Sequence, residues 1–171
     1  MGAMQDDSAS AGLSKIKPLS DLALIRGQLR GQGKAVVVTN GHFDLLHVGH
    51  LRYLQRARAL GDCLIVGVNS DASTRRLKGD RRPLVPQEER AELLAGLACV
   101  DYVVIFDELT AEHVVEVLEP DIYVKGGDYA ASPHWPESDL VQRQGGRVLA
   151  LPYVSGHSTS QLIQRIVDRY R

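Results

Sequence analysis

The sequence predicts a doubly wound α/β fold, built as a single domain on a five-stranded parallel sheet, and three observations lead to this prediction. The length of 171 residues suits one domain with a sizeable core of its own. From Lys34 onward, short runs rich in β-branched residues alternate with segments of helical period. These runs are apolar throughout, as in parallel strands that helices cover on both faces. The expected architecture is therefore Rossmann-like.

Five apolar runs are the expected strands. They are Ala35–Thr39, Leu64–Val68, Tyr102–Phe106, Ile122–Val124 and Arg147–Leu151. Helical spacing of apolar residues predicts helices over Leu19–Leu29, Gly49–Leu60 and Gln87–Leu97. The last of these follows Pro86, a residue that suits a first helical position.

The two ends of the chain have distinct patterns. Residues 1–13 are small and polar without periodicity, so we expect a disordered leader or a cloning remnant, and we assign the domain to residues 14–171. At the other end, Ser158–Gln161 fits a capping box. An apolar stripe follows it, formed by Leu162, Ile163, Ile166, Val167 and Tyr170. The chain is therefore expected to close on an amphipathic helix.

Composition and charge exclude several classes of protein. Lys plus Arg number 20 and Asp plus Glu 21, giving a net charge of −1, which is unlike the basic footprint of a nucleic-acid-binding protein. No apolar run is long enough for a membrane span, and no secretory leader is present, so we expect a cytoplasmic protein without a membrane partner. Cys63 and Cys99 form no CxxC motif and are expected to be small, reduced core residues.

The segment Val36–His50 carries the densest chemistry. Here an apolar strand runs through a turn directly into a helix, and three of the six histidines fall within it. His47 and His50 are three residues apart at the start of that helix, so both can face one side, and Gly49 between them permits close approach of the backbone. The carboxyl end of a strand and the N-terminus of a helix together favour a bound anion. The pattern predicts a phosphate site.

Two other interpretations of the histidine pair stay open on the residues alone. Two histidines at this spacing can bind zinc, although the carboxylate base of an HExxH motif is absent and only Asp44 lies near enough in sequence to supply a ligand. The pair could also be surface histidines without a role. We assign no metal site.

Gly41–Asp44 and His47–His50 together resemble the GxFDxxHxGH signature of the cytidylyltransferase-like nucleotidyltransferases. Further segments resemble the branch of this family that forms ADP-heptose. They are Asn69–Pro83, Glu88–Ala91, Val100–Glu108 and Pro120–Tyr129, and the likeness spans about Lys34 to Arg165. The resemblance implies transfer of AMP from ATP to D-glycero-β-D-manno-heptose 1-phosphate, with release of pyrophosphate, for lipopolysaccharide core or related glycan precursors.

The resemblance also implies roles for individual residues. His47 and His50 would hydrogen-bond the α-phosphate and the departing pyrophosphate, and Lys78, expected on the loop after the second strand, would bridge donor and acceptor phosphates. Residues expected to bind the nucleotide are Asn40, Gly41, Phe43, Asp44, Arg90, Lys125, Gly126, Asp128, Ser158 and Thr159. Arg75, Arg76 and Arg82 are weaker candidates.

The chain departs from the family pattern at two places. Glycerol-phosphate and choline-phosphate cytidylyltransferases carry RTxGIST where this chain has Tyr153–Thr159, so an arginine that would reach the nucleotide phosphates is missing. This departure favours the heptose branch. His42 stands where that branch often has Cys and other members have Thr, so its side chain is not expected to be essential.

Partners and alternatives complete the expectation. The resemblance implies ATP with Mg²⁺ and a homodimer, and the heptose 1-phosphate would come from a separate kinase. A glycerol-3-phosphate cytidylyltransferase or an FMN adenylyltransferase would keep the fold and change the substrate. A non-catalytic nucleotide-binding module is a different class, against which the intact His47, His50 and Lys78 argue; an aminoacyl-tRNA synthetase fragment lacks a KMSKS-like loop. The Pro133–Pro136 loop could contact the sugar or only pack.

Overall fold

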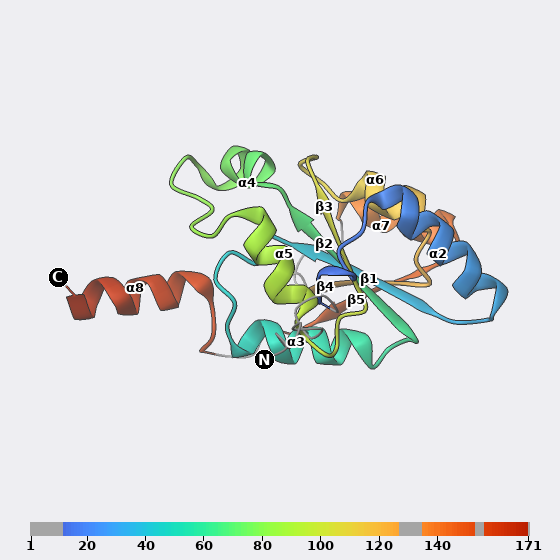
Figure 1. Cartoon of the computed structure of the whole chain (residues 1–171), viewed down its shortest axis with the longest axis horizontal. Helices are drawn as coiled ribbons and strands as arrows, with labels where there is room; N and C mark the ends of the chain where they lie inside the picture. The colour runs from blue at the N-terminus through green and yellow to red at the C-terminus, as the bar shows by residue number, and fades with distance from the viewer. Residues whose placement is uncertain (1–11, 127–134, 153–155, 171) are drawn as a thin grey trace, which may run out of the picture.

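The computed structural model describes residues 12–126, 135–152 and 156–170, and these form one α/β unit (Figure 1). Its parallel sheet has the order β3-β2-β1-β4-β5. The strands are β1 Val36–Gly41, β2 Cys63–Asn69, β3 Tyr102–Phe106, β4 Ile122–Gly126 and β5 Arg147–Leu151. All five lie where the sequence predicts strands, with ends that differ by two residues or fewer. The fold class is confirmed.

Helices cover both faces of the sheet (Figure 1). On one face lie α3 Val48–Arg58 and α5 Gln87–Ala95, which pack Leu54 and Leu94 against the strands. On the other lie α2 Leu19–Gly31, α6 Glu112–Leu118 and α7 Pro136–Arg143, which bury Leu22, Leu118 and Val141. Because successive strand residues point to opposite faces, the two cores share each strand: Val37 enters the first core, and Val36 and Val38 the second.

Two helices stand apart from these layers. The short helix α4, Asp71–Lys78, follows β2 at the carboxyl edge of the sheet, and α8, Thr159–Tyr170, projects away from the body of the domain (Figure 1). The apolar stripe on α8 is confirmed as a pattern, but none of its residues is buried, and Ile166 and Tyr170 are 48% and 86% exposed.

The sheet order creates a crevice beside β1. The chain proceeds from β1 outward to β2 and β3, then returns to β4 on the other side of β1 and continues to β5. At such a switch point the connections leave the strands in opposite directions, and ligands of open α/β sheets bind there, beyond the carboxyl ends of the strands. The histidine segment lies at this position, because it follows β1 directly.

The structure corrects the sequence prediction in several details. Lys78 lies in the last turn of α4 and not on a loop, and Ser70 caps that helix by accepting a hydrogen bond from the Ser73 N–H at 3.1 Å. Pro136 begins α7, so the expected Pro133–Pro136 loop ends before it, and Pro86 occupies the N-cap of α5. Pro133 and most of the 1–13 leader lie outside the described residues.

The cysteines fit the prediction of core residues. Both are free; Cys63 is buried at the start of β2 and Cys99 is half-buried against the core. Burial raises the pKa of the Cys63 thiol to about 12, so it remains protonated. In the described part of the chain, no helix has both the length and the apolar character to cross a lipid bilayer.

Candidate active site at the carboxyl edge of the sheet

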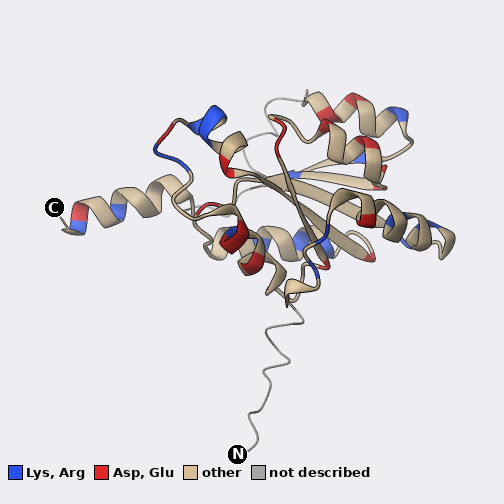
Figure 2. Cartoon of the chain, turned by 45° about the horizontal axis from the view of Figure 1, so that its top comes forward, with Lys and Arg blue, Asp and Glu red and all other residues tan. Residues whose placement is uncertain are grey.

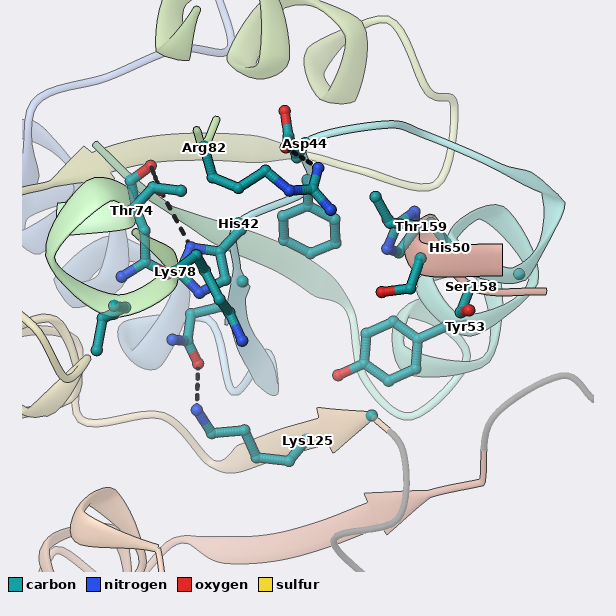
Figure 3. A pocket seen from close by; sticks show the side chains of 18 of the residues that line it. His42, Asp44, His50, Tyr53, Thr74, Lys78, Arg82, Lys125, Ser158 and Thr159 are labelled. Atoms are coloured by element: carbon teal, nitrogen blue, oxygen red, sulfur yellow. Dashed lines mark hydrogen bonds and ion pairs between the residues drawn. The ribbon is translucent and has the colours of Figure 1, made fainter. Parts of the chain in front are cut away.

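A cavity of about 920 Å³ opens at the switch point (Figure 3). Its walls come from the segment after β1, the start of α3, the exposed side of α4, the end of β4, and the start of α8. The expected site residues that line it are Asn40, Gly41, Phe43, Asp44, His47, His50, Lys78, Lys125, Gly126, Ser158 and Thr159. The fold therefore brings most of the expected site into one cavity, and this volume falls within the range of small-molecule sites.

The two histidines of the motif lie side by side at the N-terminus of α3. His47 is the N-cap residue and His50 lies in the first turn, and their rings stack with centroids 3.9 Å apart. The Phe43 ring meets His50 edge-on at 5.4 Å. The Nδ1 atoms of both histidines are buried without a hydrogen-bond partner among the described residues. The two rings are thus held by packing, and among the described residues their Nδ1 atoms have no hydrogen-bond partner.

Burial keeps these imidazoles neutral. Burial, with a smaller contribution from His47, lowers the pKa of His50 to about 4. Burial also lowers the pKa of His47, and His157 adds to that effect. Desolvation penalises the charged imidazolium, so at neutral pH the free protein presents two uncharged rings.

The turn between β1 and α3 has an unusual backbone. Phe43 has φ of 48°, in the left-handed region that few non-glycine residues adopt. A Cβ on Gly41 would lie 3.1 Å from the Phe43 ring, so a larger residue there would press on that ring. The strained turn places Phe43 beneath His50 and brings Asp44 inward.

Asp44 is committed to protein contacts. Its carboxylate accepts hydrogen bonds from the Leu84 N–H at 2.7 Å and the Val85 N–H at 3.0 Å, and it pairs with the Arg82 guanidinium. The residue is 7% exposed. Asp44 therefore holds the segment after α4 against the turn between β1 and α3. Its ion-pair partner, Arg82, also lines the cavity.

Among the described residues, Arg90 is the expected nucleotide-binding residue that does not line the cavity. Its side chain is fully buried in α5. The guanidinium donates to the Val85 carbonyl at 2.9 Å and to the His42 carbonyl, and it pairs with the Asp71 carboxylate at 2.8 Å. Arg90 thus joins three segments that carry site residues and has no surface left for a ligand.

The α4 side of the cavity is cationic. Lys78 lines the cavity from the last turn of the helix, and Arg75 and Arg76 lie exposed on the same helix. Lys and Arg gather at this end of α4 and the loop after it (Figure 2). Thr74, which the sequence analysis missed, faces the cavity from the same helix and is hydrogen-bonded to His42. This side suits a phosphate group.

The β4 side has a buried polar network. The Lys125 ammonium donates to the Asn40 Oδ1 at 2.8 Å and lies 3.4 Å from the Glu137 carboxylate. The Tyr123 hydroxyl donates to the same Asn40 oxygen at 2.7 Å, and Glu137 also accepts from the Ala111 N–H at 2.9 Å. Burial lowers the pKa of Lys125, and Glu137 opposes that shift. Sequence reasoning missed Glu137, because only the fold brings α7 beside β4.

The end of β4 leaves room for close approach. A Cβ on Gly126 would lie 3.0 Å from the Tyr53 ring, and the Tyr53 hydroxyl donates to the Val124 carbonyl at 3.1 Å. Gly126 therefore lets the strand pass against an aromatic side chain at the cavity wall. Asp128, the other expected residue here, lies outside the described residues.

The start of α8 lies beside the histidines and closes the cavity there. Ser158 accepts a hydrogen bond from the Gln161 N–H at 3.2 Å, which confirms the expected cap. Ser158, Thr159 and His157 all line the cavity, and a Cβ on Gly49 would lie 3.0 Å from the His157 Cβ. Two helix N-termini thus face the same space, and both favour negatively charged groups.

The cavity's carboxylates do not form a metal cage. Asp44 and Glu137 are both held by protein donors, and the described residues contain no cluster of three metal-ligating side chains. The described side chains can therefore bind an anion through neutral histidines, cations and helix N-termini, but they do not fit a resident divalent ion.

Comparison with known proteins gives the relatives of this chain. A family model described as Cytidylyltransferase-like matches residues 38–165. The chain is 54% identical over 161 residues to "Bifunctional protein HldE" of Syntrophotalea carbinolica, and 52% identical over 159 residues to the protein of that name from Geobacter sulfurreducens. These matches cover 92% and 93% of this chain but 32% of each relative, so the chain spans about a third of the length of these curated relatives.

Solved structures share the fold. The lipopolysaccharide core biosynthesis protein from Thermoplasma volcanium aligns with a TM-score of 0.58 at 30% identity, over 71% of this chain and 98% of that one. Pantoate-beta-alanine ligase from Francisella tularensis aligns with a TM-score of 0.57 at 12% identity, over 90% of this chain and 76% of that one. The second likeness concerns the fold alone.

Proposed function

The chain belongs to the cytidylyltransferase-like family, and on that premise we propose that it transfers AMP from ATP to D-glycero-β-D-manno-heptose 1-phosphate. An oxygen of the sugar phosphate attacks the α-phosphorus of ATP. The bond from that phosphorus to the oxygen bridging to the β-phosphate breaks, and pyrophosphate leaves. The products are ADP-heptose and pyrophosphate, for a lipopolysaccharide core or a related glycan.

The stacked histidines at the N-terminus of α3 are the observation that carries this proposal. His47 and His50 offer uncharged ring nitrogens beside free helix N–H groups, which suits the α-phosphate and the departing pyrophosphate. The sugar phosphate is already an anionic nucleophile near neutral pH, so the step needs no strong general base. Positioning and stabilisation of charge supply the rate.

Residues on the two sides of the cavity bind different parts of the two substrates in this proposal. Lys78, on α4, bridges the acceptor phosphate and the α-phosphate, so that two anions can approach each other. On the opposite side, Lys125 and Gly126 bind the nucleoside, while Ser158 and Thr159 at the start of α8 cradle the outer phosphates. Phe43, Asp44 and Asn40 shape the wall between these sides.

The heptose acceptor is favoured over the alternatives by the relatives. Proteins named "Bifunctional protein HldE" match over 92% of this chain at about half identity, and the segment 153–159 lacks the arginine of the RTxGIST pattern. A glycerol-3-phosphate cytidylyltransferase or an FMN adenylyltransferase is the alternative within the same mechanism, and a non-catalytic nucleotide-binding module is the alternative without it.

Mg²⁺ enters the proposal only as the ion that accompanies the phosphates of ATP. Since Asp44 and Glu137 are held by protein donors, no described carboxylate of the cavity is assigned to it. The reaction is placed in the cytoplasm, where free thiols such as Cys63 stay reduced. Heptose 1-phosphate is supplied by a kinase site outside this chain.

A homodimer is part of the proposal, on the resemblance to the family. The structure offers α8 as a candidate contact, because its apolar stripe stands exposed and clear of the domain (Figure 1). Burying such a stripe against a second copy would remove Ile166 and its neighbours from water.

Pyrophosphate release tests the proposal. ATP and CTP are each combined with β-heptose 1-phosphate, glycerol 3-phosphate and FMN in the presence of Mg²⁺, and His47→Ala serves as the control. Release only with ATP and heptose 1-phosphate, lost in the variant, is the expected result. Release with another pair would overturn the substrate assignment, and binding of ATP with no release in any combination would favour the non-catalytic module.

A further inference from the structure

His42 is a third histidine of the cavity, and the reaction described above does not use it. It directly follows β1, and its side chain reaches across to α4, where its Nδ1 lies 3.1 Å from the Thr74 hydroxyl. The ring is partly buried and lines the cavity beside Lys78 (Figure 3). The resemblance to the family gives this side chain no essential role, but its contacts determine which hydrogen bonds its ring can make.

The contacts of the Thr74 hydroxyl favour one tautomer of the ring. The Thr74 hydroxyl lies 3.5 Å from the Asn69 carbonyl, which can only accept, so the hydroxyl proton is directed there. The Thr74 oxygen is then the acceptor for a proton on His42 Nδ1. The other ring nitrogen, Nε2, then carries a lone pair, and the bond to Thr74 is the only side-chain hydrogen bond of His42 among the described residues.

The surroundings keep the ring uncharged. Burial, together with the positive charges of Lys78, Arg90 and Lys125, lowers the pKa of His42 to about 4, and Asp44 alone opposes these effects. In neutral solution His42 thus stays an acceptor at Nε2 and does not become a second donor.

A hydrogen-bond acceptor such as Nε2 does not match a phosphate group, whose oxygens are themselves acceptors. Lys78, Arg82 and the N-termini of α3 and α8 are donors, which match phosphate oxygens. The lone pair of Nε2 would repel such an oxygen, so the group that matches it must carry a proton. On the α4 side, next to the phosphate at Lys78, that group is a hydroxyl of the acceptor.

We propose that His42 Nε2 accepts a hydrogen bond from a hydroxyl group of the sugar phosphate and thereby selects a polyhydroxylated acceptor. This inference rests on the proposed function and adds the residue that reads the sugar. The location supports the sugar as the partner, because His42 reaches α4 through Thr74 and lies beside Lys78, the residue assigned to the acceptor phosphate.

Two substitutions separate the two ring nitrogens. The amide of His42→Asn reaches the position of Nδ1, so it keeps the bond to Thr74 but leaves the cavity without the acceptor. The longer His42→Gln brings an amide oxygen to the position of Nε2. His113→Asn, on the exposed side of α6, is the matched control. All three are compared with the unaltered chain by steady-state pyrophosphate release and by melting temperature.

We expect His42→Asn to raise the KM for heptose 1-phosphate about tenfold, which is the loss of one hydrogen bond worth about 1.4 kcal/mol. The KM for ATP and the melting temperature should change little, and His42→Gln should recover part of the loss. A merely structural role at Thr74 would not give this pattern, because the Asn variant retains that contact.

Three outcomes overturn the inference. With an active unaltered chain, an unchanged KM for heptose 1-phosphate in His42→Asn would show that Nε2 does not contact the sugar. A rise confined to the KM for ATP would move the contact to the nucleotide. No turnover of heptose 1-phosphate by the unaltered chain would overturn the proposed function, and this inference with it.

Discussion

Replacing Arg90 by lysine tests whether this side chain positions the site or binds the nucleotide. The guanidinium is fully buried and reaches two carbonyls and the Asp71 carboxylate, whereas a lysine ammonium offers one nitrogen in place of three. At least one carbonyl loses its charged partner. Since hydrogen bonds to charged groups contribute about 1.5–3 kcal/mol each, we expect a loss of roughly 3 kcal/mol in the free energy of unfolding.

That loss corresponds to a fall of roughly 6–12 °C in melting temperature for a chain of this size. Thermal and urea unfolding of Arg90→Lys measure it, with Arg56→Lys on the exposed side of α3 as the matched control. The KM for ATP is measured alongside and should change less than about threefold. If stability were unchanged within about 0.5 kcal/mol while the KM for ATP rose tenfold or more, Arg90 would be a nucleotide-binding residue and the positioning role would be refuted.

Three further predictions concern the histidines and α8. His50→Ala should lower kcat at least about 100-fold in pyrophosphate release, as expected for loss of a donor to developing charge, while His113→Ala should retain full activity. Because burial lowers the pKa of His42 and of His50 to about 4, the unfolded chain binds more protons than the folded chain between pH 6.5 and pH 4. Urea unfolding should therefore show a free energy of unfolding about 2 kcal/mol lower at pH 5 than at pH 7. An equal loss in the variant with Asn at both positions would contradict this cause. Ile166→Glu should convert a dimer to a monomer in light scattering, and a dimer that persists would exclude α8 from the interface.

The strands could be predicted from sequence because this sheet is buried on both faces. All seven residues of β2 are buried, so its apolar run is continuous and can be recognised as a strand without an alternating pattern. Helix α4 could not be found in the same way, because Asp71–Lys78 is polar almost throughout and lies at the edge of the sheet. Its helical form depends on the Ser70 cap and on contacts with Asn69 and Glu108, which are properties of the folded chain.

The site residues also divide into those that the local sequence predicts and those that only the fold brings to the cavity. His47 and His50 lie three residues apart at a strand–helix junction, so local geometry alone predicts that they converge. Glu137 and Thr74 carry no such signal, since they reach the cavity from distant elements. Arg90 shows the converse case: the resemblance to the family implied a nucleotide-binding role, but its burial, which only the fold determines, gives it three protein acceptors instead.

The charge states of the cavity suit the proposed reaction because its cations and its histidines respond to different charges. In the proposed reaction, Lys78 attracts phosphates that are negative before the reaction begins, and so would contribute to binding of both substrates. The uncharged rings of His47 and His50 add little attraction for a resting anion, but their hydrogen bonds strengthen as charge accumulates on the leaving pyrophosphate. Only interactions that are stronger in the transition state than in the ground state accelerate a chemical step. Under the proposed function, the burial that holds these histidines neutral would therefore direct their contribution to the rate, while the exposed lysine on α4 would contribute to substrate binding.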